Sequence, residues 1–277
     1  MPIATLDGSG IVYGDEGAGP SVVLLHGGGS NRRQWTPLAA LLSDRYRVLA
    51  PDIYGHGDSP LWPGAAAPGL VDFGMIVGET VAAAGAAGEN GPPHVVGHSG
   101  GGAFALTYAC HHPDAVRSMV LIEPTAVHLL RFAGRQAAWQ EAYDLGRRHI
   151  DLIAAGKAEA CADMFLPYWI GQAAWDATPP ERRAPIVAAM PTVATFWAAC
   201  FAETTGPADY VRITAPVLLM RGTQTTRASD EVVDLLADIL PNAALVEIED
   251  AGHMSPLTHA DEVNTAIAAF LDGVARR

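Results

Sequence analysis

Runs of apolar residues, most of them ended by glycine, proline or a polar residue, recur along the chain and predict buried β-strands. They occupy residues 11–13, 21–25, 46–50, 94–96, 115–122, 215–220 and 243–248, with a predicted turn at 14–20. A run such as Val22-Val23-Leu24-Leu25 lacks polar alternation, which is typical of a parallel sheet covered on both faces. Predicted helices lie between the strands, at 35–42, 71–87, 103–111, 230–240 and 258–271. This order of elements predicts an α/β fold with a largely parallel sheet.

The pattern changes between residues 124 and 210. Amphipathic helical stretches such as 131–153 and 157–165 replace the strand runs. Four of the six tryptophans lie here, Trp139, Trp169, Trp175 and Trp197. Breaks in the helices are expected at Gly156, Pro167, Pro179, Pro180 and Pro191. We therefore expect a helical insertion at 124–210 within a core domain formed by 1–123 and 211–277, and we expect each tryptophan to pack in the core of the insertion rather than against a substrate.

A short strand, a serine flanked by glycines and a helix follow one another at residues 94–111. Ser99 stands in the pentapeptide Gly97-His98-Ser99-Gly100-Gly101. A serine at so sharp a turn has a strained backbone, so the residues two places before and after it have to be small. The strain points the hydroxyl outward, and the amide of Gly100 lies at a helix N-terminus, where free N–H groups can stabilise an oxyanion. Ser99 is therefore the candidate nucleophile, with a purely structural turn as the alternative.

This stretch resembles the nucleophile elbow of the α/β-hydrolase superfamily, and the likeness extends over nearly the whole chain. It implies an eight-stranded, mostly parallel sheet flanked by helices, with residues 124–210 as a helical cap inserted after strand 6. The sequence His26-Gly27-Gly28-Gly29 follows a buried strand and matches the HGGG-type oxyanion loop of the superfamily. The resemblance implies that the amides of Gly28 and Gly100 form the oxyanion hole. An ordinary flexible turn is the alternative for this loop.

Residues 51–59 resemble the DxxGxGxS loop of the same superfamily. The loop holds two carboxylates and a histidine, Asp52, Asp58 and His56. In the superfamily this loop is mainly architectural, because its carboxylates pair with nearby amides. The resemblance therefore implies structural roles for these three side chains.

A serine hydroxyl needs a base that can take its proton near neutral pH, and a histidine does so without a large change in pKa. His253 follows a glycine beyond the last predicted strand, where the superfamily carries its catalytic base. His26 and His98 compete with it because both flank the cleft. We expect His26 to brace the oxyanion loop and the side chain of His98 to point away from the direction of the nucleophile.

The acid of the triad departs from the common pattern. Most relatives carry it in a Gly-x-x-Asp context after the seventh strand, but here the matching run ends in Thr225. Asp230 looks like the cap of a helix that begins there, and Asp250 is expected to serve the local turn. Glu123 is the preferred acid, because it ends the strand after the elbow helix, a position that a minority of α/β hydrolases use. A role for Glu123 at the cap hinge, Asp230 as the acid, and a missing acid remain as alternatives.

Composition narrows the range of partners. The 277 residues carry 17 basic and 30 acidic side chains, a net charge of −13, which argues against nucleic acid or an anionic membrane surface. The N-terminus lacks a basic region followed by an apolar run, and no stretch reaches 18 apolar residues, so we expect a soluble, cytoplasmic protein without a membrane partner. Three widely spaced cysteines predict buried free thiols, and no motif predicts a metal or another cofactor. The expected partner is a small-molecule substrate, and a homodimer is left open.

A serine rather than an aspartate at the elbow directs the chemistry toward acyl transfer, since dehalogenases and epoxide hydrolases of this fold use an aspartate. We therefore predict a carboxylesterase-like serine hydrolase (EC 3.1.1) that cleaves an ester of a small apolar substrate through Ser99, His253 and Glu123. Hydrolysis of a C–C bond in a diketone, of a thioester or of a lactone, and perhydrolase activity, remain alternatives on the same triad. A binding protein on a hydrolase scaffold, with its triad degraded at Thr225, is the alternative from another class.

Overall fold

A computed structural model of the chain describes residues 3–5, 10–86 and 90–276, and its centre is one eight-stranded sheet with the order β1-β2-β4-β3-β5-β6-β7-β8. The strands are β1 (Ile3–Thr5), β2 (Val12–Glu16), β3 (Ser21–Leu25), β4 (Arg47–Pro51), β5 (His94–His98), β6 (Ser118–Ile122), β7 (Val217–Gly222) and β8 (Ala243–Ile248). β2 pairs in antiparallel fashion with β1 and β4, and the pairings from β4 through β8 are parallel. The predicted α/β fold with a mostly parallel sheet is confirmed.

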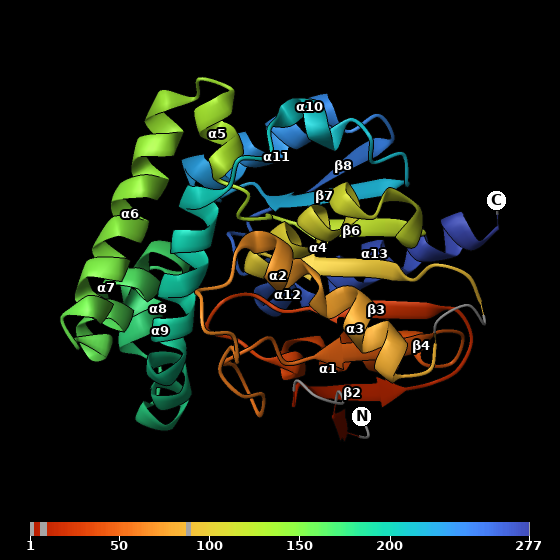
Figure 1. Cartoon of the computed structure of the whole chain (residues 1–277), viewed down its shortest axis with the longest axis horizontal. Helices are drawn as coiled ribbons and strands as arrows, with labels where there is room; N and C mark the ends of the chain where they lie inside the picture. The colour runs from red at the N-terminus through yellow and green to blue at the C-terminus, as the bar shows by residue number, and fades with distance from the viewer. Residues whose placement is uncertain (1–2, 6–9, 87–89, 277) are drawn as a thin grey trace.

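Helices cover both faces of this sheet (Figure 1). The helices of the core domain are η1 (Arg32–Trp35), α1 (Thr36–Leu42), α2 (Leu70–Gly74), α3 (Ile76–Ala83), α4 (Gly100–His111), η2 (Pro113–Ala115), α11 (Arg227–Ile239), α12 (Ser255–Thr258) and α13 (Ala260–Ala275). Side chains of α1 and α13, such as Leu42 and Ile267, share one hydrophobic cluster with the sheet. Side chains of α2, α3, α4 and α11 form the cluster on the other face. Because both faces are covered, β3, β5 and β6 are buried at every position.

Loops that are distant in sequence start side by side at the carboxyl ends of the parallel strands. The register pairs Leu25 of β3 with Gly97 of β5, and His98 of β5 with Ile122 of β6. The loop after β3, the elbow after β5 and the acidic residue after β6 therefore emerge at one edge of the sheet. This edge is where a ligand binds in open α/β sheets.

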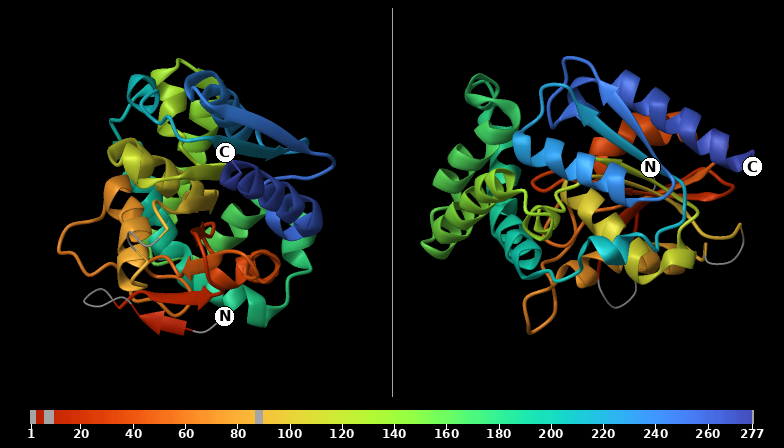
Figure 2. Two further views of the ribbon diagram at one scale, coloured as in Figure 1. Left: turned by 90° about the vertical axis from the view of Figure 1, so that its right-hand side faces the viewer. Right: turned by 90° about the horizontal axis from the view of Figure 1, so that it is seen from above.

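The segment between β6 and β7 is helical. It contains α5 (His128–Phe132), α6 (Gln136–Ala154), α7 (Ala158–Ile170), α8 (Gln172–Asp176), α9 (Pro180–Ala202) and α10 (Pro207–Tyr210). α6, α7 and α9 pack on one another and form a layer at one end of the core domain (Figures 1 and 2). Below, residues 124–210 are called the insertion.

The expected helix breaks at Pro167 and Pro191 are wrong. Pro167 lies inside α7, and α9 contains both Pro185 and Pro191. Each proline removes an N–H donor and crowds the preceding turn. However, α9 buries side chains such as Val193 and Trp197, so tertiary packing outweighs the local cost.

Two predicted helices are interrupted. The stretch 71–87 divides at Met75 into α2 and α3, and its last residue lies outside the described residues. The stretch 131–153 divides between α5 and α6 at Gly134, whose φ of +68° favours glycine. The positive φ of Gly134 is local backbone geometry that the apolar pattern does not encode.

The predicted turn at 14–20 is partly wrong, because β2 continues to Glu16. Asp15 forms an ion pair at 2.6 Å with Arg47 of the neighbouring strand β4. The polar residues of this antiparallel strand therefore have a partner across the ladder, which explains how they remain in the sheet.

By length and composition alone, α9 is the one helix among the described residues that could cross a membrane. Part of this helix is buried against α6 and α7, and another part lines the pocket described below. Its apolar character is therefore used inside this fold, and it does not by itself indicate a membrane span.

Candidate active site

Ser99 lies at the junction of β5 and α4 with φ +54° and ψ −120°. This is a conformation that residues with a side chain rarely adopt. The turn is held by the Ser99 amide, which donates to the Ile122 carbonyl at 3.0 Å. A Cβ atom on Gly97 would lie 2.5 Å from the Gly101 carbonyl oxygen, and one on Gly101 would lie 2.5 Å from the Leu25 carbonyl oxygen. Both flanking positions therefore require glycine, and the strained serine hydroxyl faces the pocket.

The loop after β3 brings a second backbone amide toward Ser99. A Cβ atom on Gly100 would lie 3.9 Å from the amide nitrogen of Gly28, so the two predicted oxyanion donors are neighbours. His26 braces this loop as expected. Its Nε2 accepts the N–H of Ile53 at 3.0 Å, so its proton is on Nδ1, which donates to the Gly27 carbonyl at 2.8 Å.

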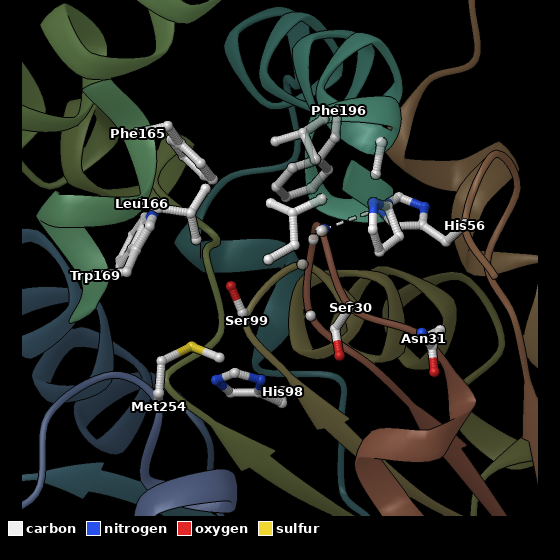
Figure 3. A pocket seen from close by; sticks show the side chains of 18 of the residues that line it. Ser30, Asn31, His56, His98, Ser99, Phe165, Leu166, Trp169, Phe196 and Met254 are labelled. Atoms are coloured by element: carbon white, nitrogen blue, oxygen red, sulfur yellow. Dashed lines mark hydrogen bonds between the residues drawn. The ribbon is translucent and has the colours of Figure 1, made fainter. Parts of the chain in front are cut away.

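His56 braces the same loop from the other side (Figure 3). Its Nε2 accepts the amide N–H of Gly29 at 3.0 Å, and its Nδ1–H donates to the Tyr54 carbonyl at 3.0 Å. Burial lowers the pKa of both His26 and His56 below the ordinary value. Both rings therefore stay neutral near pH 7 and keep the acceptor nitrogen that the bracing bond needs.

The carboxylates of the 51–59 loop serve the local structure. Arg32 forms ion pairs with both Asp52 and Asp58, the latter at 2.7 Å. Asp52 is fully buried and also accepts the amide N–H groups of Arg32 and Asp58, at 2.7 and 2.9 Å. Neither carboxylate lines the pocket. These are the local amide contacts that the resemblance implies.

His253 follows β8 and places its imidazole between Ser99 and Glu123. The Nε2 atom lies 2.9 Å from Oγ of Ser99, and Nδ1 lies 2.7 Å from Oε2 of Glu123. Because the carboxylate can only accept, the neutral ring carries its proton on Nδ1 and turns a lone pair toward Ser99. The structure thus brings the three predicted residues together in the order that proton transfer from a serine requires.

Glu123 is fully buried at the end of β6, with a positive φ of 42°. Besides the imidazole, its carboxylate accepts the N–H of Gly222 at 2.9 Å and the hydroxyl of Thr225 at 2.5 Å. Burial favours a raised pKa, but hydrogen bonding and charge attraction with His253, together with the Gly222 and Thr225 donors, hold the pKa of Glu123 below its ordinary value. The carboxylate is therefore ionised near pH 7 and can stabilise an imidazolium.

The two rival carboxylates have other partners. Asp230 forms an ion pair with Arg221 at 2.8 Å, and Asp250 accepts a side-chain amide of the neighbouring loop at 3.1 Å. The expectation that Asp230 caps its helix is wrong, because α11 begins earlier. The N-cap of α11 is Thr226, whose hydroxyl accepts the N–H of Ser229. Asp230 lies in the first turn instead, where a negative charge also suits the helix dipole.

A cavity of about 470 Å³ opens between the core domain and the insertion, and Ser99 lies at its wall. One side of the cavity is mainly apolar and comes from α7, α9 and the loop after β8. The other side is more polar and comes from the glycine loop, Ser30, Asn31 and His56 (Figure 3). Apolar or aromatic residues of the first side include Phe165, Leu166, Trp169, Phe196 and Met254. The cavity therefore suits an apolar group beside the serine and polar atoms opposite it.

The expectation that each tryptophan of the insertion packs in its core is not met throughout. Trp175 is buried within the insertion, but Trp169 and Trp197 line the cavity. The ring of Trp169 lies against that of His253, with centroids 4.0 Å apart. No spacing or neighbouring motif in the sequence separates these residues.

The three cysteines, Cys110, Cys161 and Cys200, are buried and free, as predicted. Within residues 3–5, 10–86 and 90–276, no group of three His, Cys, Asp or Glu side chains is arranged to hold a metal ion.

Two curated relatives align with nearly the full chain. The chain is 27% identical over 265 residues to (E)-2-((N-methylformamido)methylene)succinate hydrolase of Acinetobacter baylyi, covering 94% of this chain and 93% of the relative. It is 30% identical over 275 residues to pimeloyl-(acyl-carrier protein) methyl ester esterase of Methylococcus capsulatus, covering 95% and 98%. Both relatives are hydrolases by name.

A solved structure shares the fold of this chain, and a family model matches most of its sequence. The enol-lactonase of Burkholderia xenovorans LB400 superposes with a TM-score of 0.76 at 23% identity, covering 98% of this chain and all of that one. The model of the alpha/beta hydrolase fold family matches residues 20–260. That range contains Ser99, Glu123 and His253. The chain therefore belongs to the alpha/beta hydrolase fold family.

Proposed function

We propose that the protein is a carboxylesterase-like serine hydrolase that cleaves an ester of a small to medium-sized apolar substrate. One observation carries the proposal: the contacts run without a gap from the Ser99 hydroxyl through both nitrogens of His253 to the buried carboxylate of Glu123. The serine end of this series lies at the wall of a largely apolar cavity. A hydroxyl that has both a base and an accessible cavity is the arrangement that nucleophilic catalysis requires.

The reaction follows from these contacts. Ser99 Oγ attacks the ester carbonyl carbon while Nε2 of His253 takes the hydroxyl proton, and the carbonyl oxygen becomes an oxyanion between the amides of Gly28 and Gly100. Collapse of this intermediate breaks the bond to the alcohol oxygen, which takes the proton from His253. Water then attacks the acyl-enzyme by the same route and frees Ser99. Glu123 stabilises the imidazolium in both halves of the reaction.

The curated relatives support hydrolysis and one of them supports the bond type. The Methylococcus capsulatus relative is named a methyl ester esterase, and the Acinetobacter baylyi relative is named a hydrolase of a succinate derivative. Lactone, thioester and diketone C–C hydrolysis and perhydrolysis could use the same three side chains. The ester is favoured because the Methylococcus capsulatus relative is named a methyl ester esterase, and the largely apolar cavity suits an apolar acyl or alkyl group.

The test is covalent labelling followed by turnover. A fluorophosphonate probe is expected to label the native protein and to leave Ser99→Ala unlabelled. Hydrolysis of p-nitrophenyl esters of increasing acyl length, measured beside a lactone and a thioester, then ranks the bond types. A native protein that takes no label would support the binding-protein alternative, and faster turnover of the lactone or thioester would reassign the bond.

A further inference from the structure

A series of hydrogen bonds connects the oxyanion loop with the backbone of His253, and no role assigned above uses it. It passes through two buried side chains, Gln34 of η1 and His98 of β5. Oε1 of Gln34 accepts the N–H of Gly27 at 3.3 Å, and Nε2 of Gln34 lies 3.2 Å from Nδ1 of His98. Nε2 of His98 lies 2.9 Å from the backbone carbonyl oxygen of His253.

The two backbone ends determine the direction of every bond in this series. The N–H of Gly27 can only donate, so the oxygen of the Gln34 amide faces it and the NH2 group faces His98. That NH2 group can only donate, so Nδ1 of His98 accepts and carries no proton. The proton of His98 is therefore on Nε2, where it donates to the carbonyl of His253. One arrangement of protons satisfies all three bonds.

His98 has to be uncharged for this series to exist. A proton on Nδ1 would face the NH2 group of Gln34 and break the middle bond. Burial and the neighbouring His253 lower the pKa of His98 to about 3, so the ring is neutral near pH 7. The centroids of the His98 and His253 rings are 5.0 Å apart. A neutral His98 therefore does not oppose the imidazolium that forms on His253 during the reaction.

The series also has little room to move. A Cβ atom on Gly27 would lie 2.9 Å from Nδ1 of His98, so the oxyanion loop lies directly against the ring. His98 precedes Ser99 in sequence. Its Nε2 bonds to the backbone of His253, and its Nδ1 bonds to Gln34, which in turn bonds to the oxyanion loop. A shift of either loop would therefore stretch a bond in this series.

We propose that Gln34 and His98 are positioning residues, which set the distance between the oxyanion loop and the backbone of His253 and so hold the base in line with Ser99. This inference rests on the proposed hydrolase function. Misplacing a catalytic group by about 1 Å can cost about 100-fold in rate. Gln34 does not line the cavity, whereas His98 does, so breaking the series at Gln34 is expected to lower kcat and to leave KM nearly unchanged.

The test compares His98→Phe with His98→Gln in hydrolysis of a p-nitrophenyl ester. Phenylalanine keeps a planar ring but has no donor or acceptor, whereas glutamine offers one oxygen acceptor and one nitrogen donor. We expect His98→Phe to lower kcat about 10- to 100-fold, and His98→Gln to recover most of that loss. Equal kcat values in the two variants would overturn the proposal.

A second variant keeps the proposal testable if His98→Phe prevents the elbow from folding. Gln34→Leu breaks the series from the other side, outside the elbow, and is expected to lower kcat in the same way. In the double variant Gln34→Leu/His98→Phe the loss should not exceed that of the more damaged single variant, because each change already breaks the series. Losses that multiply would show two independent effects and would contradict the proposal.

The matched control is His94→Phe, at the other end of the same strand. His94 is also fully buried and bonds to the Ser118 hydroxyl at 2.7 Å, far from the loops of the site. It is expected to lower the melting temperature but not kcat, and a fall in kcat equal to that of His98→Phe would overturn the proposal. A native protein that takes no fluorophosphonate label would instead overturn the hydrolase function itself, together with this inference.

Discussion

The hydroxyl of Thr225 donates to Oε2 of Glu123 at 2.5 Å, and the same oxygen accepts the Nδ1–H of His253 at 2.7 Å. Thr225 stands where most relatives of this superfamily are expected to carry the acid. The carboxylate that β6 supplies therefore reaches the point that an acid on the loop after β7 would occupy. Threonine keeps a donor at this point instead of a second negative charge, which would raise the pKa of a buried carboxylate beside it.

This relationship predicts that the acid can be moved back to residue 225. Glu123→Gln is expected to lower kcat about 10³- to 10⁴-fold, because an amide cannot stabilise the imidazolium and can favour the wrong tautomer. The double variant Glu123→Gln/Thr225→Asp is expected to recover at least about 10-fold of this loss, since it restores a carboxylate near Nδ1 of His253. Steady-state rates on one p-nitrophenyl ester measure both changes.

The single variant Thr225→Asp is the control for that experiment. With Glu123 still present it places two carboxylates at one site, so we expect a lower kcat than that of the native enzyme. Near-native turnover in Glu123→Gln would show that Glu123 is not the acid. A double variant no faster than Glu123→Gln would show that the two positions do not reach the same point.

The glycines of the elbow give a second prediction, which concerns folding. Alanine at Gly97 or Gly101 would place a Cβ atom 2.5 Å from a backbone carbonyl oxygen, and backbone atoms on neighbouring strands and helices cannot move aside easily. We expect each variant to lose about 3 kcal/mol or more of unfolding free energy, or to fail to fold. Urea unfolding followed by circular dichroism measures the loss.

Gly100 provides the matched comparison for these variants. A Cβ atom there would meet the ring of Phe196 at 3.6 Å, an ordinary contact distance. Gly100→Ala should therefore fold with stability close to that of the native protein, whatever it does to the rate. Similar unfolding free energies for Gly97→Ala and Gly100→Ala would contradict the close approach that the structure shows.

Because several histidines are buried, we expect the unfolding free energy to decrease in mild acid. Burial is the main cause that lowers the pKa of His94 and of His128, each to about 4. Between their ordinary value of 6.5 and about 4, the unfolded chain binds protons that the folded chain does not. The unfolding free energy therefore decreases as the pH falls through this window, by up to about 1.4 kcal/mol per pH unit for each such histidine. Urea unfolding at intervals from pH 7.5 to 4.5 measures the slope.

The control for this pH dependence replaces one of the two histidines. His94→Gln retains a polar group for the Ser118 hydroxyl but does not titrate, so its stability should fall less steeply between pH 6.5 and 4 than that of the native protein. Glu123 does not contribute in this window. Its lowered pKa stabilises the fold above its ordinary value of 4.5, and this contribution is lost only at lower pH. An unchanged slope in His94→Gln would reject the assignment.

Much of the sheet and the strained turn at Ser99 could be predicted from the sequence, because each rests on a local constraint. Unbroken apolar runs such as the one in β3 are stable only between two layers of helices. The glycines at 97 and 101 signal a turn that excludes side chains. The position of Glu123 beside this turn could also be predicted, because neighbouring parallel strands end at the same edge of the sheet. These signals all lie within a few residues of the feature that they predict.

Other parts of the site depend on contacts between distant segments and leave no local signal. Gln34 meets His98 across 64 residues, and its role depends on which nitrogen of that ring holds the proton. The sequence pattern places the start of α11 too late, because Asp230 is a good helix cap by type, whereas Thr226 is the cap that the chain uses. In the same way, the sequence does not distinguish Trp169, at the pocket, from Trp175, inside the insertion.

Trp169 gives the last prediction, which concerns the base. Its ring lies 4.0 Å from that of His253 between centroids, and its indole N–H has no hydrogen-bond partner among the described residues. The side chain therefore acts through its aromatic surface, which a phenyl ring largely retains. An aromatic contact of this kind contributes about 0.5–1.5 kcal/mol, or roughly 2- to 10-fold in rate if it orients the imidazole.

We expect Trp169→Ala to lower kcat/KM by that factor on a short p-nitrophenyl ester and Trp169→Phe to stay near the native value. Because alanine also enlarges the apolar side of the cavity, the loss should shrink as the acyl chain lengthens. Equal losses in the two variants would point instead to the indole N–H, and an unchanged rate in both would show that the ring does not orient the base.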